Sequence, residues 1–319
     1  MMVYILFAIG FVILIKGADI LVAGSASIAK KYKVSDMVIG LTIVSMGTSM
    51  PELIVNILAS SSGSADIAIG NVIGSNISNI LLILGVAALI YPLAVNEKSV
   101  LSEIPYSLIA TLLLAFLANA AFFGDEPSVL SRIDGLILMA FFSLFMIYII
   151  RLIRQGRREM VDDVPDSLLP FGKSVLFVVL GILGLFFGGK WVVEGAIHIA
   201  SQFGLSEKLI GLTIVAIGTS LPELVTSAVA AYRKSTDIAV ANVIGSNIFN
   251  LLWVLGISAM IKPMSYDPLI NTDIMVLIGA TCLIFFSMVI GKPNSIDRFN
   301  GVYFLLAYVG YLVFLIMRG

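Results

Sequence analysis

Long apolar runs and short polar interruptions alternate along the whole chain. A run of about twenty apolar residues is long enough to cross the hydrocarbon core of a bilayer as an α-helix. The pattern predicts an all-α membrane protein in which short connections join ten transmembrane helices. The predicted spans are residues 3–29, 36–60, 66–91, 100–121, 131–152, 173–200, 207–232, 237–261, 271–290 and 298–317.

One connection differs from the others because it is long and charged. The stretch RLIRQGRREMVDDVPDSLLPFGK occupies residues 151–173 and separates the first five spans from the last five. We therefore expect a five-helix unit at 1–150, a linker at 151–172 and a second five-helix unit at 173–319.

The two units share a sequence at a constant offset of 171 residues. Residues 35–92 and 206–263 align without a gap, and about 32 of the 58 positions are identical, which chance does not produce. Because each copy of this duplication has an odd number of spans, the second copy enters the membrane from the opposite side. The expected plan is two inverted repeats, with broken helices that meet near the membrane midplane.

Composition agrees with a membrane protein and excludes other classes. Only 12% of the residues are charged, against about 25% in soluble domains, and the mean hydropathy is +1.07. The net charge is −1 without a basic patch, so nucleic acid is not an expected partner. The single cysteine, Cys282, rules out an internal disulfide. The N-terminal stretch lacks a basic region and a cleavage site, so we expect it to be the first span.

Lysine and arginine residues near the predicted span ends are unevenly distributed. Because such residues concentrate on the cytoplasmic side, the richer side is predicted to be cytoplasmic. Both termini should then be extracellular, the 151–172 loop cytoplasmic, and the protein a multi-pass component of the cell membrane. The predicted cytoplasmic residues are Lys30, Lys31, Lys33, Lys98, Arg151, Arg154, Arg157, Arg158, Lys173, Arg233, Lys234, Lys292 and Arg298. The predicted extracellular residues are Arg132, Lys208, Lys262 and Arg318.

The repeat places a glutamate directly after a proline within an apolar run, as GTSMPE at 47–52 and as GTSLPE at 218–223. A proline inside a helix removes one hydrogen bond and displaces the carbonyl four residues earlier. Pro51 and Pro222 should therefore open the backbone near Gly47 and Gly218. A glutamate at membrane depth is costly, and its presence indicates a functional site.

Hydroxyl and amide side chains accompany each glutamate at helical spacing. Thr48 and Ser49 precede Glu52 by four and three residues, so they share a helix face with it. In the second motif, GNVIGSNISN at 70–79, Ser75 and Asn79 also share a face. The equivalent residues of the second repeat are Thr219, Ser220, Glu223, Ser246 and Asn250. Such an oxygen-only pocket suits Ca²⁺ and Na⁺ and argues against zinc, copper or iron.

The paired motifs resemble the two α-repeats of the calcium/cation antiporter superfamily, and most closely those of prokaryotic sodium/calcium exchangers. The resemblance covers GTSMPE with GNVIGSNISN, GTSLPE with ANVIGSNIFN, and the ten-span plan. It implies a midplane site at which transported Na⁺ and Ca²⁺ compete, with no cofactor and no enzymatic activity. It implies the ligands Thr48, Ser49, Glu52, Ser75, Asn79, Thr219, Ser220, Glu223, Ser246 and Asn250, and the main-chain carbonyls of Ser45 and Ala216.

The charge of this pocket suggests a mechanism. Asn79 and Asn250 stand where some relatives carry an aspartate, so the pocket should hold two carboxylates, which does not favour K⁺ co-transport. An empty pocket with two buried negative charges is costly, so the carrier should switch sides only when it is loaded. We expect electrogenic Ca²⁺ extrusion by a monomer. An H⁺/Ca²⁺ antiporter of the same superfamily remains an alternative, and a cation channel fits the inverted motifs less well.

Lys16 with Asp19, and Lys190 with Glu194, are also at helical spacing. This spacing predicts ion pairs within the first and sixth spans.

Overall fold

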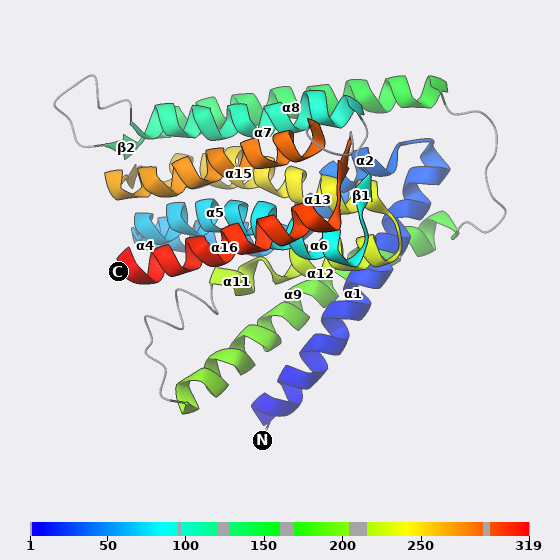
Figure 1. The fold of residues 1–319 in the computed structure, drawn as a ribbon, viewed down its shortest axis with the longest axis horizontal. Helices are drawn as coiled ribbons and strands as arrows, with labels where there is room; N and C mark the ends of the chain where they lie inside the picture. The colour runs from blue at the N-terminus through cyan, green and yellow to red at the C-terminus, as the bar shows by residue number, and fades with distance from the viewer. Residues whose placement is uncertain are drawn as a thin grey trace.

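The structure, a computed structural model, describes residues 2–94, 97–119, 128–159, 169–203, 216–289 and 294–318. These residues are almost entirely helical, so the all-α prediction is confirmed (Figure 1). The first half contains α1 (Met2–Tyr32), α2 (Asp36–Ile39), the π-helix Gly40–Val44, α3 (Ser45–Thr48), α4 (Met50–Ser62), α5 (Ala65–Ser78), the π-helix Asn79–Ile83, α6 (Leu84–Ile90), β1 (Leu93–Ala94), α7 (Glu97–Ala118), β2 (Val129–Leu130) and α8 (Arg132–Glu159).

From α9 and α11 onward, the described part of the second half follows much of this order. It contains α9 (Phe171–Gln202), α11 (Ala216–Thr219), α12 (Leu221–Tyr232), α13 (Thr236–Ile248), the π-helix Phe249–Val254, α14 (Leu255–Ile261), β3 (Met264–Ser265), a 3₁₀-helix at Pro268–Ile270, α15 (Asn271–Val289), β4 (Ser295–Ile296) and α16 (Arg298–Arg318).

Seven described helices are long and apolar enough to cross a membrane. An eighth crossing results if Asp36–Thr48 and Met50–Ser62, which are bent by 46°, form one broken span. The predicted span at 100–121 appears as α7, whose apolar part Ser102–Ala118 is shorter. The first part of the predicted span at 207–232 lies outside the described residues. The number ten therefore stays a prediction.

The contact between α1 and α9 shows the inverted relation of the two repeats. A Cβ added at Gly10 would lie 3.0 Å from the carbonyl oxygen of Gly188, and one added at Gly17 would lie 3.0 Å from that of Gly181. At the offset of 171, Gly10 corresponds to Gly181 and Gly17 to Gly188. The two contacts are therefore exchanged by the repeat, as expected for inverted copies.

Two short strand pairs join connections at opposite ends of the helices. β1 pairs with β4 through Leu93 and Ile296, and β2 pairs with β3 through Val129 and Ser265, both antiparallel. In each pair, the two connections are predicted to lie on the same side of the membrane. Which of the two sides is cytoplasmic stays a prediction.

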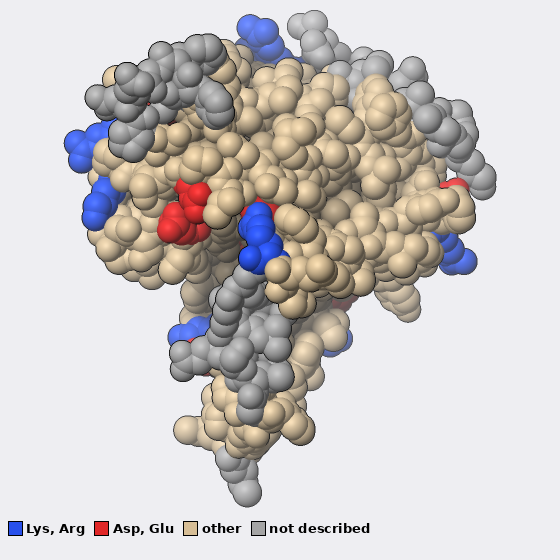
Figure 2. All heavy atoms as spheres, turned by 60° about the vertical axis from the view of Figure 1, so that its left-hand side comes forward, with Lys and Arg blue, Asp and Glu red and all other residues tan. Residues whose placement is uncertain are grey.

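The helices that carry the second motif form the centre of the protein. In the apolar stretch of Thr236–Ile261, 94% of the residues are buried, and in Ala65–Ile90 72% are buried. The corresponding share is between 17% and 33% in the other five spans. Figure 2 shows few charged side chains on the face drawn there, as contact with lipid requires. The candidate ligands of these helices therefore lie inside the protein, away from lipid.

Candidate functional site

Each repeat breaks a helix at the serine that precedes the proline. Ser49 separates α3 from α4 with φ −83° and ψ 5°, and Ser220 separates α11 from α12 with φ −87° and ψ 6°. Pro51 and Pro222 then lie in the first turn of the following helix. A proline is tolerated there but not in a helix interior, which accounts for both breaks. The prediction of broken helices is confirmed.

The two glutamates lie in the first turns of α4 and α12, where the helix dipole favours negative charge. Glu52 and Glu223 are both fully buried. Glu223 Oε1 accepts hydrogen bonds from Ser49 Oγ at 3.1 Å and from Ser246 Oγ at 3.4 Å. Because Ser49 belongs to the first repeat and Glu223 to the second, this contact joins the two motifs directly.

The other hydroxyl groups also bridge the repeats. Thr48 Oγ1 donates to Asn242 Oδ1 at 3.1 Å, and Thr219 Oγ1 donates to Asn71 Oδ1 at 3.3 Å. Sequence reasoning missed Asn71 and Asn242. They occupy equivalent positions in GNVIGSN and ANVIGSN, so their identity in both repeats was the available signal. Ser220 Oγ of the second repeat likewise donates to Ser75 Oγ of the first, at 3.2 Å.

The two predicted amide ligands present one free oxygen each. The amide nitrogens of Asn79 and Asn250 donate to the side-chain oxygens of Asn247 and Asn76, at 3.0 and 3.1 Å. The side-chain oxygens of Asn79 and Asn250 are buried and have no hydrogen-bond partner. They are therefore available to a cation.

The implied main-chain ligands are less open. The carbonyl oxygen of Ser45 accepts from Ser49 N at 2.9 Å and lies 3.2 Å from Thr48 Oγ1. A hydroxyl has one proton, so this carbonyl keeps a lone pair for a cation while Thr48 donates to Asn242. Ala216 begins α11 in the second repeat.

Five buried side-chain oxygens at this interface lack a hydrogen bond: both of Glu52, Oε2 of Glu223, and Oδ1 of Asn79 and of Asn250. A buried polar atom without a partner is costly, so such a cluster calls for an explanation. Carboxylate and amide oxygens are the ligands that hard cations such as Ca²⁺ take. Among the described residues no group of three or more His, Cys, Asp or Glu could hold a metal ion. The oxygens present, from two carboxylates and two amides, make up a mixed oxygen site.

A cavity of about 410 Å³ leads to this site from one side. It lies between α4, which contributes Pro51 and Ile54, and α9, which contributes Lys190 and Glu194. The candidate ligand Thr219 forms part of its wall. The cavity therefore reaches the edge of the site at Thr219, while the carboxylate and amide oxygens behind it are buried.

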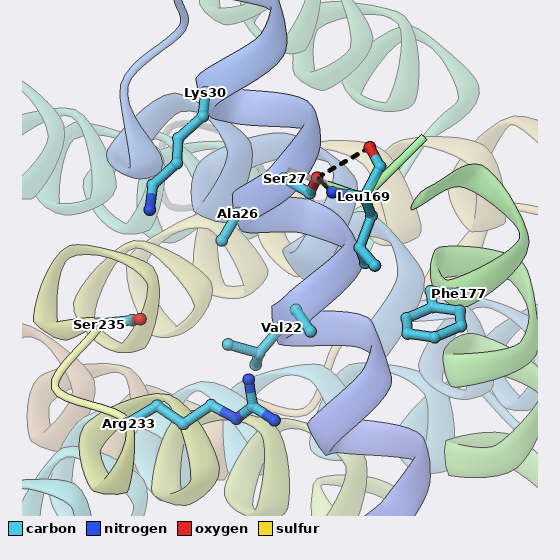
Figure 3. Close-up of a pocket in the computed structure, with 9 residues that line it drawn as sticks. Val22, Ala26, Ser27, Lys30, Leu169, Phe177, Arg233 and Ser235 are labelled. Atoms are coloured by element: carbon cyan, nitrogen blue, oxygen red, sulfur yellow. Dashed lines mark hydrogen bonds between the residues drawn. The ribbon is translucent and has the colours of Figure 1, made fainter. Parts of the chain in front are cut away.

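A second cavity, of about 520 Å³, has a different character. Lys30 and Arg233 line it together with apolar residues of α1, and Ser27 Oγ accepts from Leu169 N at 3.1 Å beside it (Figure 3). None of the predicted ligands borders this cavity. Its wall carries two basic side chains, of which Arg233 is paired with Asp19.

Two inverted repeats with an oxygen-lined site at their interface define a membrane transporter of the inverted-repeat class. The chain matches the sodium/calcium exchanger protein family over residues 2–151 and 173–317, and it belongs to that family.

Individual relatives agree with this membership. The chain is 40% identical to the putative antiporter CaxA of Alkalimonas amylolytica, with 95% of each chain covered. It is 34% identical to the sodium/calcium exchanger MaX1 of Methanosarcina acetivorans, with 98% of each covered. Among solved structures it is similar to the sodium-calcium exchanger NCX_Mj, with 32% identity, a TM-score of 0.80 and 98% of each chain covered.

Proposed function

We propose that this protein exchanges Na⁺ for Ca²⁺ across the cell membrane by alternating access. The observation that carries this proposal is the cluster of five unpartnered oxygens, which both repeats supply at one buried interface. Membership of the sodium/calcium exchanger family supports the choice of the two ions.

The proposed ligand set draws equally on the two repeats. Glu52 and Glu223 supply the negative charge, and the hydroxyl, amide and main-chain groups complete the coordination. The full set is Thr48, Ser49, Glu52, Ser75, Asn79, Thr219, Ser220, Glu223, Ser246 and Asn250, with the carbonyls of Ser45 and Ala216. Because one chain supplies both halves of the site, a monomer suffices.

Charge couples the two ion fluxes. With both glutamates ionised the empty site carries two negative charges, one Ca²⁺ neutralises them, and three Na⁺ leave one positive charge. Burying two unpaired charges in a closed site is strongly disfavoured, so the protein changes sides only when it is loaded. If three Na⁺ exchange for one Ca²⁺, the membrane potential contributes about 2.3 kcal/mol per 100 mV.

The orientation sets the side to which the cavity opens, and the ion gradients set the direction of transport. We infer that the side rich in lysine and arginine is cytoplasmic and that both termini are extracellular. The cavity along α9 then opens outward, because it lies at the end that carries Glu194. With an inward Na⁺ gradient, Ca²⁺ is extruded.

The test is radioactive Ca²⁺ uptake into proteoliposomes loaded with Na⁺ and diluted into Na⁺-free or Na⁺-containing buffer. We expect uptake only with the outward Na⁺ gradient, and its loss by at least about a hundredfold in Glu52→Gln and Glu223→Gln, because each removes a buried ligand charge. Asp267→Asn, an exposed change of the same chemistry, is the control. Uptake that follows a pH gradient without Na⁺ would contradict the proposal, as would the absence of Ca²⁺ flux.

A further inference from the structure

Four asparagines form one hydrogen-bond network where α5 and its π-helix meet α13 and its π-helix. Two of them, Asn79 and Asn250, belong to the proposed ligand set. The other two, Asn76 and Asn247, lie outside it. They are equally buried, with exposed fractions of 0% and 1%.

Main-chain carbonyls determine the orientation of the second pair. Asn76 Nδ2 donates to the carbonyl oxygen of Asn247 at 3.1 Å, and Asn247 Nδ2 donates to that of Asn76 at 3.3 Å. A carbonyl oxygen can only accept, so the amide nitrogen of each side chain must point toward it. The side-chain oxygens of Asn76 and Asn247 therefore point the other way.

These oxygens determine in turn how the ligand amides lie. Asn250 Nδ2 donates to Asn76 Oδ1 at 3.1 Å, and Asn79 Nδ2 donates to Asn247 Oδ1 at 3.0 Å. Reversing either ligand amide would bring two acceptor oxygens together and turn an N–H group toward the bound ion. Because the network starts at the backbone, only one orientation satisfies it.

We propose that Asn76 and Asn247 are positioning residues, which turn the amides of Asn250 and Asn79 so that both present oxygen to the transported cation. Each acts on the ligand of the opposite repeat. The two repeats thus set each other's ligands, and the two inner helices are held together at the site. This proposal rests on the ligand set proposed above.

The test compares the Ca²⁺ concentration for half-maximal Na⁺-driven uptake in variants with that in the native protein. Asn76→Ala should raise it by about ten- to a hundredfold, the usual effect of removing a group that orients a metal ligand. In an Asn250→Asp background the same Asn76→Ala change should alter it by less than about twofold, because a carboxylate presents oxygen on either face. Asn247→Ala with Asn79→Asp provides the equivalent pair if the first set does not fold.

A matched control removes a reciprocal amide pair elsewhere. Asn119 and Asn271 exchange amide hydrogen bonds of 2.8 Å between the end of α7 and the start of α15. Asn119→Ala should lower thermal stability and leave the half-saturating concentration unchanged.

Two results distinguish an error in the ligand set from an error in the positioning role. If Asn250→Ala leaves the half-saturating concentration unchanged, the ligand set is wrong. If Asn250→Ala raises it but Asn76→Ala changes only the maximal rate, or acts equally in the Asn250→Asp background, the positioning role is wrong.

Discussion

The two helix pairs α1–α12 and α9–α4 are equivalent in the repeat but differ in packing. α1 packs along α12, and Asp19 accepts from Arg233 just beyond α12, with 2.5 Å between Oδ1 and Nη2. Between α9 and α4 lies the cavity that reaches Thr219. The positions equivalent to Asp19 and Arg233 are Lys190 and Ser62, which cannot form an ion pair.

This difference shows that the duplicated motifs and the surrounding helices have separate roles. The motifs are nearly identical in the two copies and contribute the same residue types to the site, although Ser49 donates to Glu223 whereas the equivalent Ser220 donates to Ser75. The residues at the flanking contact are not duplicated, since Asp19 and Arg233 have no charged pair as their counterpart. The structure therefore combines a duplicated ligand set with different packing on its two sides, and the cavity that reaches Thr219 lies on the side that is outward in the proposed orientation.

Cysteine accessibility provides the strongest test of the difference between the α9 side and the α1 side. Val193 and Val22 are equivalent positions on α9 and α1. Val193 borders the cavity that reaches Thr219, whereas Val22 lies at the wall of the second cavity, where no predicted ligand is found, and has an exposed fraction of only 1%. In a Cys282→Ser background, Val193→Cys should react with a soluble thiol reagent at least about ten times faster than Val22→Cys, because only water-exposed thiolates react readily. Equal rates would show that the two sides are equally open.

Removing the ion pair between Asp19 and Arg233 should have a smaller effect on the accessibility of the α1 side. The Asp19–Arg233 pair is more than one third exposed, so its contribution should be at most about 1 kcal/mol. Asp19→Asn should increase the labelling rate of Val22→Cys by less than about fivefold, and the increase should fade in high salt because surface ion pairs are screened. The control is Asp134→Asn, a matched change on α8. An unchanged rate in low salt would mean that apolar packing alone closes this side.

Much of the fold and of the site follows from the sequence, because both depend on local pattern and on the repeat. Apolar run length predicts the helices. The proline before each glutamate predicts a break in each motif near Gly47 and Gly218, and the structure has these breaks two residues later, at Ser49 and Ser220. The spacing of Lys190 and Glu194 correctly predicts their pair, which has an N–O distance of 3.8 Å.

Features that depend on packing between helices could not be predicted in this way. Asp19 has Lys16 three residues before it, yet it pairs with Arg233, 214 positions away. The roles of Asn76 and Asn247 depend on how α5 crosses α13, although their repetition in both motifs was visible. The number of spans also stays open, because part of 207–232 lies outside the described residues.

The central claim is that two inverted half-sites form a single Ca²⁺ site. Titration calorimetry of the purified protein with Ca²⁺, with and without Na⁺, measures this most directly. We predict one Ca²⁺ per chain, displaced by Na⁺, and loss of that binding in either Glu52→Gln or Glu223→Gln alone. Two Ca²⁺ per chain, with each variant losing only one, would show that the repeats bind ions independently and would contradict the account.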